Sequence, residues 1–340
     1  MRKLSLAELV QVVGEQERGK RDFLVETSQL AMKTEDEVSY LHIPAGRGTE
    51  SFILNETARA QLADRLEIPF RFAEHLRQEH PVLLDQTVNT LFRSHPEKRL
   101  IRTLGEQCRA ILSPKYRILD NFAFIGAVLP ALAGMPDAEV RECFLTDTHM
   151  QLSLTFNKAQ ALVQVGDPVC YGVLLQNSEV GVGSLSAASY IWRKVCGNGL
   201  VIPQVDGPAM RRYHLGKRID DLSRLPNDRE VWMAYQDHVR NIADKGRFPQ
   251  IVDRLQAAAQ SPVEENPVVA VEKLAKRFQL TKEESELVLD RYLAGCENSL
   301  WGMINAVTEA AKGAETVQRR VDLQTIGGKM MLSQDCLAAA

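Results

Sequence analysis

The sequence predicts an α+β protein, in which an antiparallel β-meander has flanking helices and is followed by a helical C-terminal region. Three observations support this fold class. Polar and apolar residues alternate strictly in "HMQLSLTFN" (149–157), and the surrounding segment 139–202 has the same β-like character. After about residue 225, apolar residues recur at helical spacing instead. Strands and helices therefore fall in separate stretches of the chain, which is the arrangement of α+β proteins.

The first region, residues 1–92, is expected to be mainly helical. The pattern "SLAE" is a capping box that begins a helix after Ser5. A short strand-like run, "EVSYLHIP", follows. Pro69 and Pro81 then suit the first turns of two further helices.

The second region, residues 93–225, is expected to be an α+β core with a basic hairpin and a β-meander. The runs "RLIRTL" and "CRAILS" are short and β-like, and "GEQ" between them predicts a hairpin turn. A helix over "LDNFAFIGAVLPALAG" comes next. The stretch "ALVQVGDPVCYGVLLQNSE" adds two strands about a Gly-Asp-Pro turn.

The third region, residues 226–340, is expected to be helical. Its clearest helix is "ENSLWGMINAVTEAAKG", which places Leu300, Ile304 and Val307 on one face and ends at Gly313. The stretch "SPVEENP" has the composition of a linker.

The composition is that of an ordinary globular protein. The chain has 340 residues, of which 45% are hydrophobic and 25% charged, and its formal net charge is −3. This length is enough for two domains. No run approaches the roughly 18 apolar residues that cross a bilayer, and the first residues lack the cleavage site of a signal peptide. We therefore expect a cytoplasmic protein without a membrane contact.

Neither a metal site nor a cofactor site is predicted. The six cysteines form no CxxC pair, and the seven histidines form no HExxH or HxH pattern. The chain has no P-loop, and "GVGS" (181–184) lacks the third glycine of a dinucleotide-binding loop. A turn between strands is the preferred interpretation of "GVGS". We expect no metal and no cofactor.

The stretch "VCGNGLVIPQ" (195–204) leaves three interpretations open: a catalytic thiol, a phosphate-binding turn, and a tight turn between strands. Cys196 has no local histidine to act as its base, because His214 lies well beyond it in the sequence. A small buried thiol is therefore favoured. The two glycines and Asn198 suit a backbone that needs positive φ or close approach.

Positive charge is concentrated in two stretches of this nearly neutral chain, from Arg93 to Arg117 and from Tyr190 to Arg218. Aromatic residues lie among the cations, and proteins that bind single strands use cations for phosphates and rings for bases. A solvated surface is the plain alternative. The residues expected to bind nucleic acid are Arg99, Arg102, Lys115, Tyr116, Arg117, Trp192, Arg193, Lys194 and Asn198.

Several blocks taken together resemble the phage/plasmid-like proteins grouped as domain of unknown function 932. These blocks are "ARAQLADRLEIP" (58–69), "LIRTLGEQCRAILSPKYRILDN" (100–121), "GDPVCYGVLLQNSEVGVGSLS" (166–186), "RKVCGNGLVIP" (193–203) and "LWGMINAVTEAA" (300–311). They occur in order over most of the chain. The resemblance implies a phage, prophage or plasmid origin.

We therefore expect a DNA-transaction protein of a mobile element, which binds or anneals single-stranded DNA in recombination or replication without bond-making chemistry. One alternative is an enzyme that acts on nucleic acid or a small molecule near Cys196, Asn198 and Glu179. Another is a structural or defence-interaction protein. An apolar stripe on the helix 300–311 and a small, apolar C-terminal tail predict a homo-oligomer.

Overall fold

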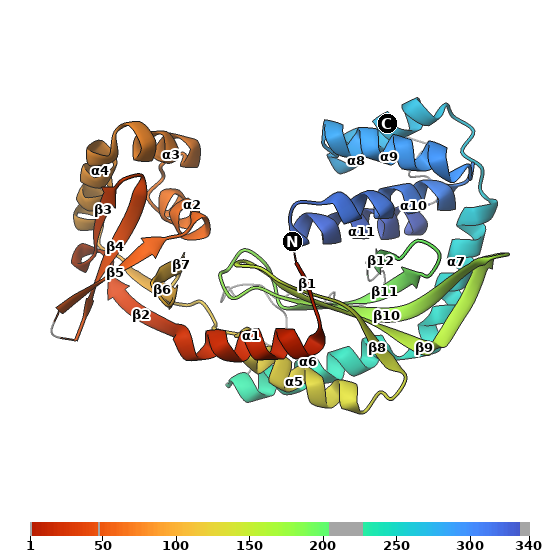
Figure 1. The fold of residues 1–340 in the computed structure, drawn as a ribbon, viewed down its shortest axis with the longest axis horizontal. Helices are drawn as coiled ribbons and strands as arrows, with labels where there is room; N and C mark the ends of the chain where they lie inside the picture. The colour runs from red at the N-terminus through yellow and green to blue at the C-terminus, as the bar shows by residue number, and fades with distance from the viewer. Residues whose placement is uncertain (1, 47, 204–226, 334–340) are drawn as a thin grey trace.

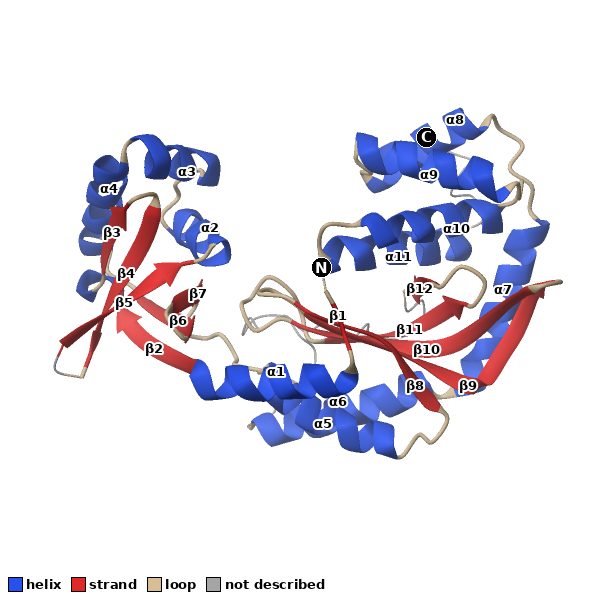
Figure 2. Cartoon of the chain, viewed as in Figure 1, coloured by secondary structure: helices blue, strands red, loops and turns tan. Residues whose placement is uncertain are grey.

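The computed structural model describes residues 2–46, 48–203 and 227–333, and these fold into two lobes, each built on a six-stranded sheet (Figure 1). The N-terminal lobe holds the sheet with the strand order β2-β6-β7-β5-β4-β3, and the C-terminal lobe holds the sheet with the order β1-β8-β9-β10-β11-β12. Each lobe has its own hydrophobic core. The protein is therefore α+β, as the sequence predicts (Figure 2).

The N-terminal lobe joins two separate stretches of the chain in one sheet. Its strands are β2 (Lys20–Glu26), β3 (Ala31–Glu35), β4 (Val38–Ala45), β5 (Gly48–Leu54), β6 (Lys98–Leu104) and β7 (Gln107–Leu112). Its helices are α2 (Glu56–Arg65), α3 (Phe70–Glu79) and α4 (Pro81–Ser94). Strands β6 and β7 form the hairpin predicted around "GEQ". Neighbouring strands pair antiparallel except β5 and β7, which pair in parallel.

This sheet crosses the boundary expected at residue 92. Strands β6 and β7 lie between β2 and β5, so residues 20–112 form one unit, and the stretch before residue 92 holds strands as well as helices. The turn between β3 and β4 is made by Asp36 and Glu37, which have φ values of 48° and 62°. Because no glycine marks this turn, the sequence gives little sign of the hairpin there.

The C-terminal lobe contains the predicted meander. Its strands are β1 (Lys3–Leu4), β8 (Ala138–Leu145), β9 (Met150–Gln164), β10 (Asp167–Asn177), β11 (Ser186–Arg193) and β12 (Asn198–Ile202). Strands β8 to β12 pair antiparallel in chain order, and β1 adds to the edge at β8. Its helices are α1 (Leu6–Gly19), α5 (Asn121–Ala133), α6 (Asp228–Ala243), α7 (Phe248–Gln260), α8 (Pro267–Phe278), α9 (Lys282–Gly295), α10 (Leu300–Ala310) and α11 (Val317–Leu332). The predicted capping box of α1 is present at Ser5 and Glu8.

Helices cover both faces of the meander (Figures 1 and 2). Helices α5, α6 and α7 pack on the face to which Leu152 and Leu154 of β9 point. Helix α11 crosses the opposite face, where Val321 packs on the sheet. Gln151 and Ser153 alternate onto this second face and are 0% exposed. The alternation predicted from the sequence is present, but its polar side is covered by a helix and does not face water.

Helix α10 is buried on every side. Leu300, Ile304 and Val307 are 4%, 0% and 0% exposed, because α7, α9 and α11 pack around this helix. The expectation that α10 exposes an apolar stripe is therefore wrong. The helix folds back over its own meander, and the homo-oligomer remains a prediction without this support.

None of the helices in the described part of the chain combines the length and the apolar character that a membrane span needs. Within the same ranges, no three His, Cys, Asp or Glu side chains come together as they do around a bound metal ion.

Candidate functional site

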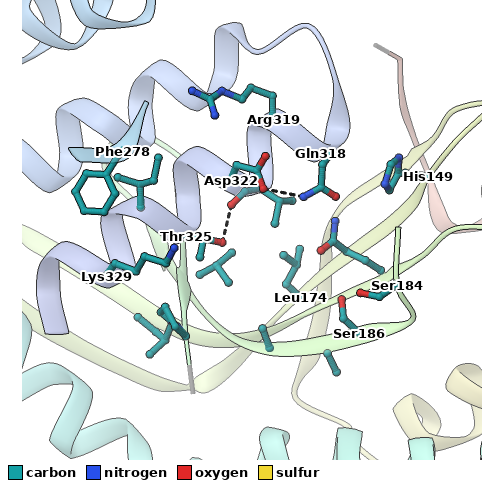
Figure 3. A pocket seen from close by; sticks show the side chains of 18 of the residues that line it. His149, Leu174, Ser184, Ser186, Phe278, Gln318, Arg319, Asp322, Thr325 and Lys329 are labelled. Carbon is teal, nitrogen blue, oxygen red and sulfur yellow. Dashed lines mark hydrogen bonds between the residues drawn. The ribbon is translucent and has the colours of Figure 1, made fainter. Parts of the chain in front are cut away.

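A cavity of about 490 Å³ lies between the second face of the meander and the helices α8 and α11 (Figure 3). Its volume falls within the range of small-molecule sites. The sheet wall includes His149, Gln176, Ser184 and Ser186. The helix wall includes Arg277, Phe278, Gln318, Arg319, Asp322, Thr325 and Lys329.

Strand register brings the polar residues of the sheet wall together. Gln176 of β10 pairs with Gln151 of β9 on one side and with Ser186 of β11 on the other. His149 stands two residues before Gln151, and Ser178 two residues after Gln176. Because side chains alternate along a strand, Gln151, Gln176 and Ser186 belong to the same face of the sheet. His149 and Ser178 lie just beyond the ends of β9 and β10, and both approach Gly183.

Several buried polar atoms of this face have no hydrogen-bond partner among the described residues: His149 Nε2, both amide atoms of Gln151, Gln176 Nε2 and Ser178 Oγ. His149 is 8% exposed, and Gln151 and Ser178 are both 0% exposed. Nearly all buried polar groups in proteins are hydrogen-bonded, so such a group of atoms marks a place where water, an ion or a ligand completes the bonding.

The helix wall of the cavity contains an aromatic ring and several positively charged side chains. Figure 3 places Phe278 and Lys329 at one end of the cavity and His149 at the other. Lys329 and Arg277 are exposed. Arg319 pairs with Glu284 of α9, with Nε 2.6 Å from Oε1. The rim of the cavity therefore has positive charge beside an aromatic side chain.

Polar groups of α11 face the sheet across the cavity. Gln318 Nε2 donates to Asp322 Oδ1 at 2.7 Å, and Thr325 Oγ1 donates to the Val321 carbonyl at 2.7 Å. Their remaining hydrogen-bonding capacity is directed at the space between helix and sheet (Figure 3).

His149 is a largely buried imidazole at one end of the cavity. Burial lowers its pKa, and Asp322 opposes that effect. Its Nδ1 lies 3.0 Å from Thr148 Oγ1. A Cβ atom at position 183 would lie 2.6 Å from its Nε2, so only a glycine allows this close packing against the imidazole. The "GVGS" turn therefore packs on the histidine at one end of the cavity.

A second cluster of functional groups lies at the junction of the two lobes. This interlobe cluster consists of Lys20, Asp22, Arg102, Arg109, Asp120 and Glu179. Glu179 accepts from Arg109 Nη2 at 3.0 Å, from the Asn121 amide at 2.6 Å, and from Lys20 Nζ. Burial raises the pKa of Glu179, but Lys20 and Arg109 outweigh burial and hold it below its usual range.

Two residues expected to bind DNA belong to this junction instead. Arg102 is 3% exposed and donates to Asp22 at 2.9 Å, to Asp120 at 2.7 Å and to the Glu179 carbonyl at 2.9 Å. Tyr116 is 7% exposed, and its hydroxyl donates to the Ser178 carbonyl at 3.2 Å. Both side chains are enclosed and hydrogen-bonded, so neither offers a surface to a DNA strand. Their partners are far away in the sequence, which is why the sequence did not reveal this role.

The turn "RKVCGNGL" joins β11 to β12 and is mainly structural. Gly197 has a φ of 65°, and a Cβ atom at position 199 would lie 2.0 Å from Tyr190 Oη. Gly197 therefore supplies the positive φ of the turn, and Gly199 allows the backbone of β12 to lie close to the Tyr190 ring. Asn198 is 3% exposed and donates to Thr308 Oγ1 of α10 at 3.3 Å. Because Asn198 is buried, it is not available for the contact with nucleic acid that the sequence predicts.

Arg193 lies beside Cys196 in the same turn. Its Nη1 donates to Cys196 Sγ at 3.3 Å, and its Nε donates to Asp167 at 2.7 Å. Arg193 and Cys196 line a smaller cavity of about 170 Å³. Trp192 is partly buried, with its ring centroid 6.3 Å from that of Tyr190.

The remaining expected contacts are spread over both lobes. Arg99 is paired with Glu97. Arg117 Nε lies 2.8 Å from Asp228 Oδ1. Lys115 and Lys194 are exposed, and Lys194 donates to Gln160 at 2.7 Å. His214 and the basic residues Arg211, Arg212, Lys217 and Arg218 lie outside the described residues. The structure does not gather the expected residues on one surface.

The cavity residues were not identified from the sequence. One of them, His149, begins "HMQLSLTFN", and the polar side of this stretch continues beside the cavity with Gln151 and Ser153. A polar strand face normally points to water, and only the position of α11 turns this one into the wall of a cavity.

The chain is therefore a two-lobed α+β protein with a polar cavity between a meander and its C-terminal helices. Residues 116–325 match the family described as Domain of unknown function (DUF932), and since this match spans more than half of the chain, the protein belongs to that family. The match covers most of the C-terminal lobe and leaves out the sheet of the N-terminal lobe. No curated protein and no solved structure matches the chain.

Proposed function

We propose that this protein is a DNA-transaction protein of a mobile element that binds single-stranded DNA, and that one nucleotide of the strand enters the cavity between α11 and the meander. The observation that carries the proposal is the combination of exposed cations and an aromatic ring at the rim with the polar side chains of the sheet wall inside. Cations attract phosphates and rings stack on bases in sites of this kind.

The rim supplies the contacts for the backbone of the strand. Lys329 and Arg277 are exposed, and Lys276 beside Arg277 is exposed as well. Phe278 lies at the same end of the cavity as Lys329 (Figure 3). A nucleotide is a ligand of the size that a cavity of about 490 Å³ accommodates.

The contact surface proposed here replaces part of the one expected from the sequence. Arg102, Tyr116 and Asn198 are buried and are left out. Lys115 and Lys194 are exposed and remain as outer contacts. In this role the protein acts in the cytoplasm during recombination or replication, and a homo-oligomer would align several cavities along one strand and so raise their effective concentration.

The test is a salt titration of single-stranded DNA binding by the double variant Arg277→Glu/Lys329→Glu. Losing phosphate contacts is expected to lower the affinity at least about tenfold at low salt and to flatten the salt dependence, because fewer counterions are released. The matched control is Arg71→Glu/Arg254→Glu, which reverses two exposed cations on α3 and α7. The proposal is overturned if the rim variant binds as the wild type does, or if both variants lose affinity equally.

A further inference from the structure

The N-terminal lobe contains a cavity of its own, of about 300 Å³. The residues that line it come mainly from the end of α2, the end of α4 and the strands β6 and β7 (Figure 1). None of them lines the cavity between α11 and the meander. Its volume is at the lower end of the range of small-molecule sites. The N-terminal cavity is therefore a separate candidate site for a small ligand.

The inner wall of the N-terminal cavity is apolar and mostly aliphatic. The apolar residues that line it are Leu30, Leu62, Leu66, Leu91, Phe92 and Ile111. Five of these six have aliphatic side chains, and Leu62 and Ile111 are buried members of the core of this lobe. Because removing apolar surface from water is favourable, this wall suits the hydrocarbon part of a ligand.

Two arginines line the polar side of the same cavity, Arg65 at the end of α2 and Arg99 on β6. Burial lowers the pKa of the Arg99 guanidinium, and the charge of Arg65 nearby lowers it further. Arg99 donates to Glu97 through Nη2 alone. Arg65 is exposed and makes no hydrogen bond or ion pair within the described residues. Both guanidinium groups therefore have donors left for an anion.

The other charged groups of the cavity limit the charge of that anion. Glu67 and Glu97 line it and are exposed, and the remaining titratable residue of the lining is His95, which is exposed as well. The two glutamates equal the two arginines in number, so a doubly charged phosphate would meet considerable repulsion. A single carboxylate adds less negative charge and still forms a bidentate pair with a guanidinium.

We propose that the N-terminal cavity binds a medium-chain fatty acid, with its carboxylate at Arg65 and Arg99 and its hydrocarbon chain along the leucines of the inner wall. The cavity volume of about 300 Å³ limits the chain to medium length. The inference does not rest on the proposed function, because it concerns a different cavity in the other lobe.

The first experiment is a calorimetric titration of the full-length protein with hexanoate, octanoate and decanoate, below the concentrations at which they form micelles. Each further methylene that is buried should raise the affinity about fourfold, so a step of two carbons should raise it at least about tenfold until the cavity is filled. Octanol and octyl phosphate have the same chain with a different head group, and each should bind at least about tenfold more weakly than octanoate. The inference is overturned if octanoate does not bind, if affinity does not depend on chain length, or if octanol or octyl phosphate binds as tightly as octanoate.

The second experiment locates the bound carboxylate with Arg65→Gln, and uses Arg71→Gln on α3 as the matched control because Arg71 is also exposed but does not line the cavity. Loss of a charge-assisted hydrogen bond should weaken octanoate binding at least about tenfold in Arg65→Gln. Because Arg65 is exposed and unpaired, the melting temperature without ligand should stay that of the wild type. Arg71→Gln should bind octanoate as the wild type does.

A third variant separates this inference from the proposed function. Arg277→Glu/Lys329→Glu, which alters the rim of the cavity under α11, should bind octanoate normally whether or not it binds DNA. Octanoate binding that survives Arg65→Gln, or that is lost in Arg277→Glu/Lys329→Glu, overturns the inference, because the ligand would then occupy another place.

Discussion

Arg109 and Glu179 form a buried ion pair across the junction of the two lobes, with Nη2 3.0 Å from Oε2. Arg109 belongs to β7 of the N-terminal lobe, and Glu179 follows β10 of the C-terminal lobe. Lys20 contacts the other carboxylate oxygen of Glu179. The Glu179 carboxylate of the C-terminal lobe therefore contacts two cations at once, and Arg109 links it to the sheet of the N-terminal lobe.

We predict that Glu179→Gln lowers the free energy of unfolding by about 3–5 kcal/mol, because it removes the counter-charge of the buried Arg109 and leaves Lys20 with Glu17 and Asp120 alone. Urea denaturation measures this loss. Glu106→Gln, in the exposed turn of the β6–β7 hairpin, is the control and should change little. A loss no larger than that of the control would show that the interlobe cluster does not hold the lobes together.

The second prediction concerns Gly199. A Cβ atom there would lie 2.0 Å from Tyr190 Oη and 2.4 Å from the ring, so Gly199→Ala should cost roughly 1–3 kcal/mol of stability. The cost should shrink in a Tyr190→Leu background, since the two sites are in contact. Gly14→Ala in α1 meets no atom within 4 Å and should instead stabilise the protein. Equal effects at both glycines would speak against the close approach.

Particular residues show which parts of the fold and of the site can be predicted from the sequence. The strict alternation of β9 predicted a strand correctly, and the glycines of "VCGNGL" predicted a tight turn. The same patterns do not reveal which partner covers a strand face, so the burial of Gln151 under α11 was not foreseen. Arg102 and Glu179 are far apart in the sequence, and their meeting depends on the docking of two lobes. Local patterns predict local structure, whereas a site between lobes or layers depends on contacts that no local pattern contains.

The third prediction follows from the pKa of His149, which burial lowers in the folded state. The unfolded chain therefore binds a proton more readily than the fold does, and stability is lost as the pH falls below about 6.5, the ordinary pKa of histidine. Thermal melts at a series of pH values measure this slope. In His149→Gln the part of the slope due to this residue should vanish. An identical pH profile in wild type and variant would contradict a neutral, buried His149.

The fourth prediction separates binding from thiol chemistry. Cys196 accepts a hydrogen bond from Arg193 and is partly exposed, so an enzyme acting there is the alternative from another class. If the turn is structural, Cys196→Ala should leave both DNA binding and the melting temperature nearly unchanged. The control is Cys296→Ala, which alters an exposed thiol at the end of α9. A catalytic turnover that Cys196→Ala abolishes and Cys296→Ala retains would favour the enzyme.

The central claim is that single-stranded DNA enters the cavity between α11 and the meander, and photo-cross-linking tests it most directly. An oligonucleotide that carries a photoreactive base is irradiated with the full-length protein, and the attached peptides are identified by mass spectrometry. Phe278 and Lys329 lie together at one end of the cavity (Figure 3), so adducts are expected in peptides that contain them, and Arg277→Glu/Lys329→Glu should lose these adducts. Adducts confined to the N-terminal lobe, or none above those formed with a control protein, would contradict the account.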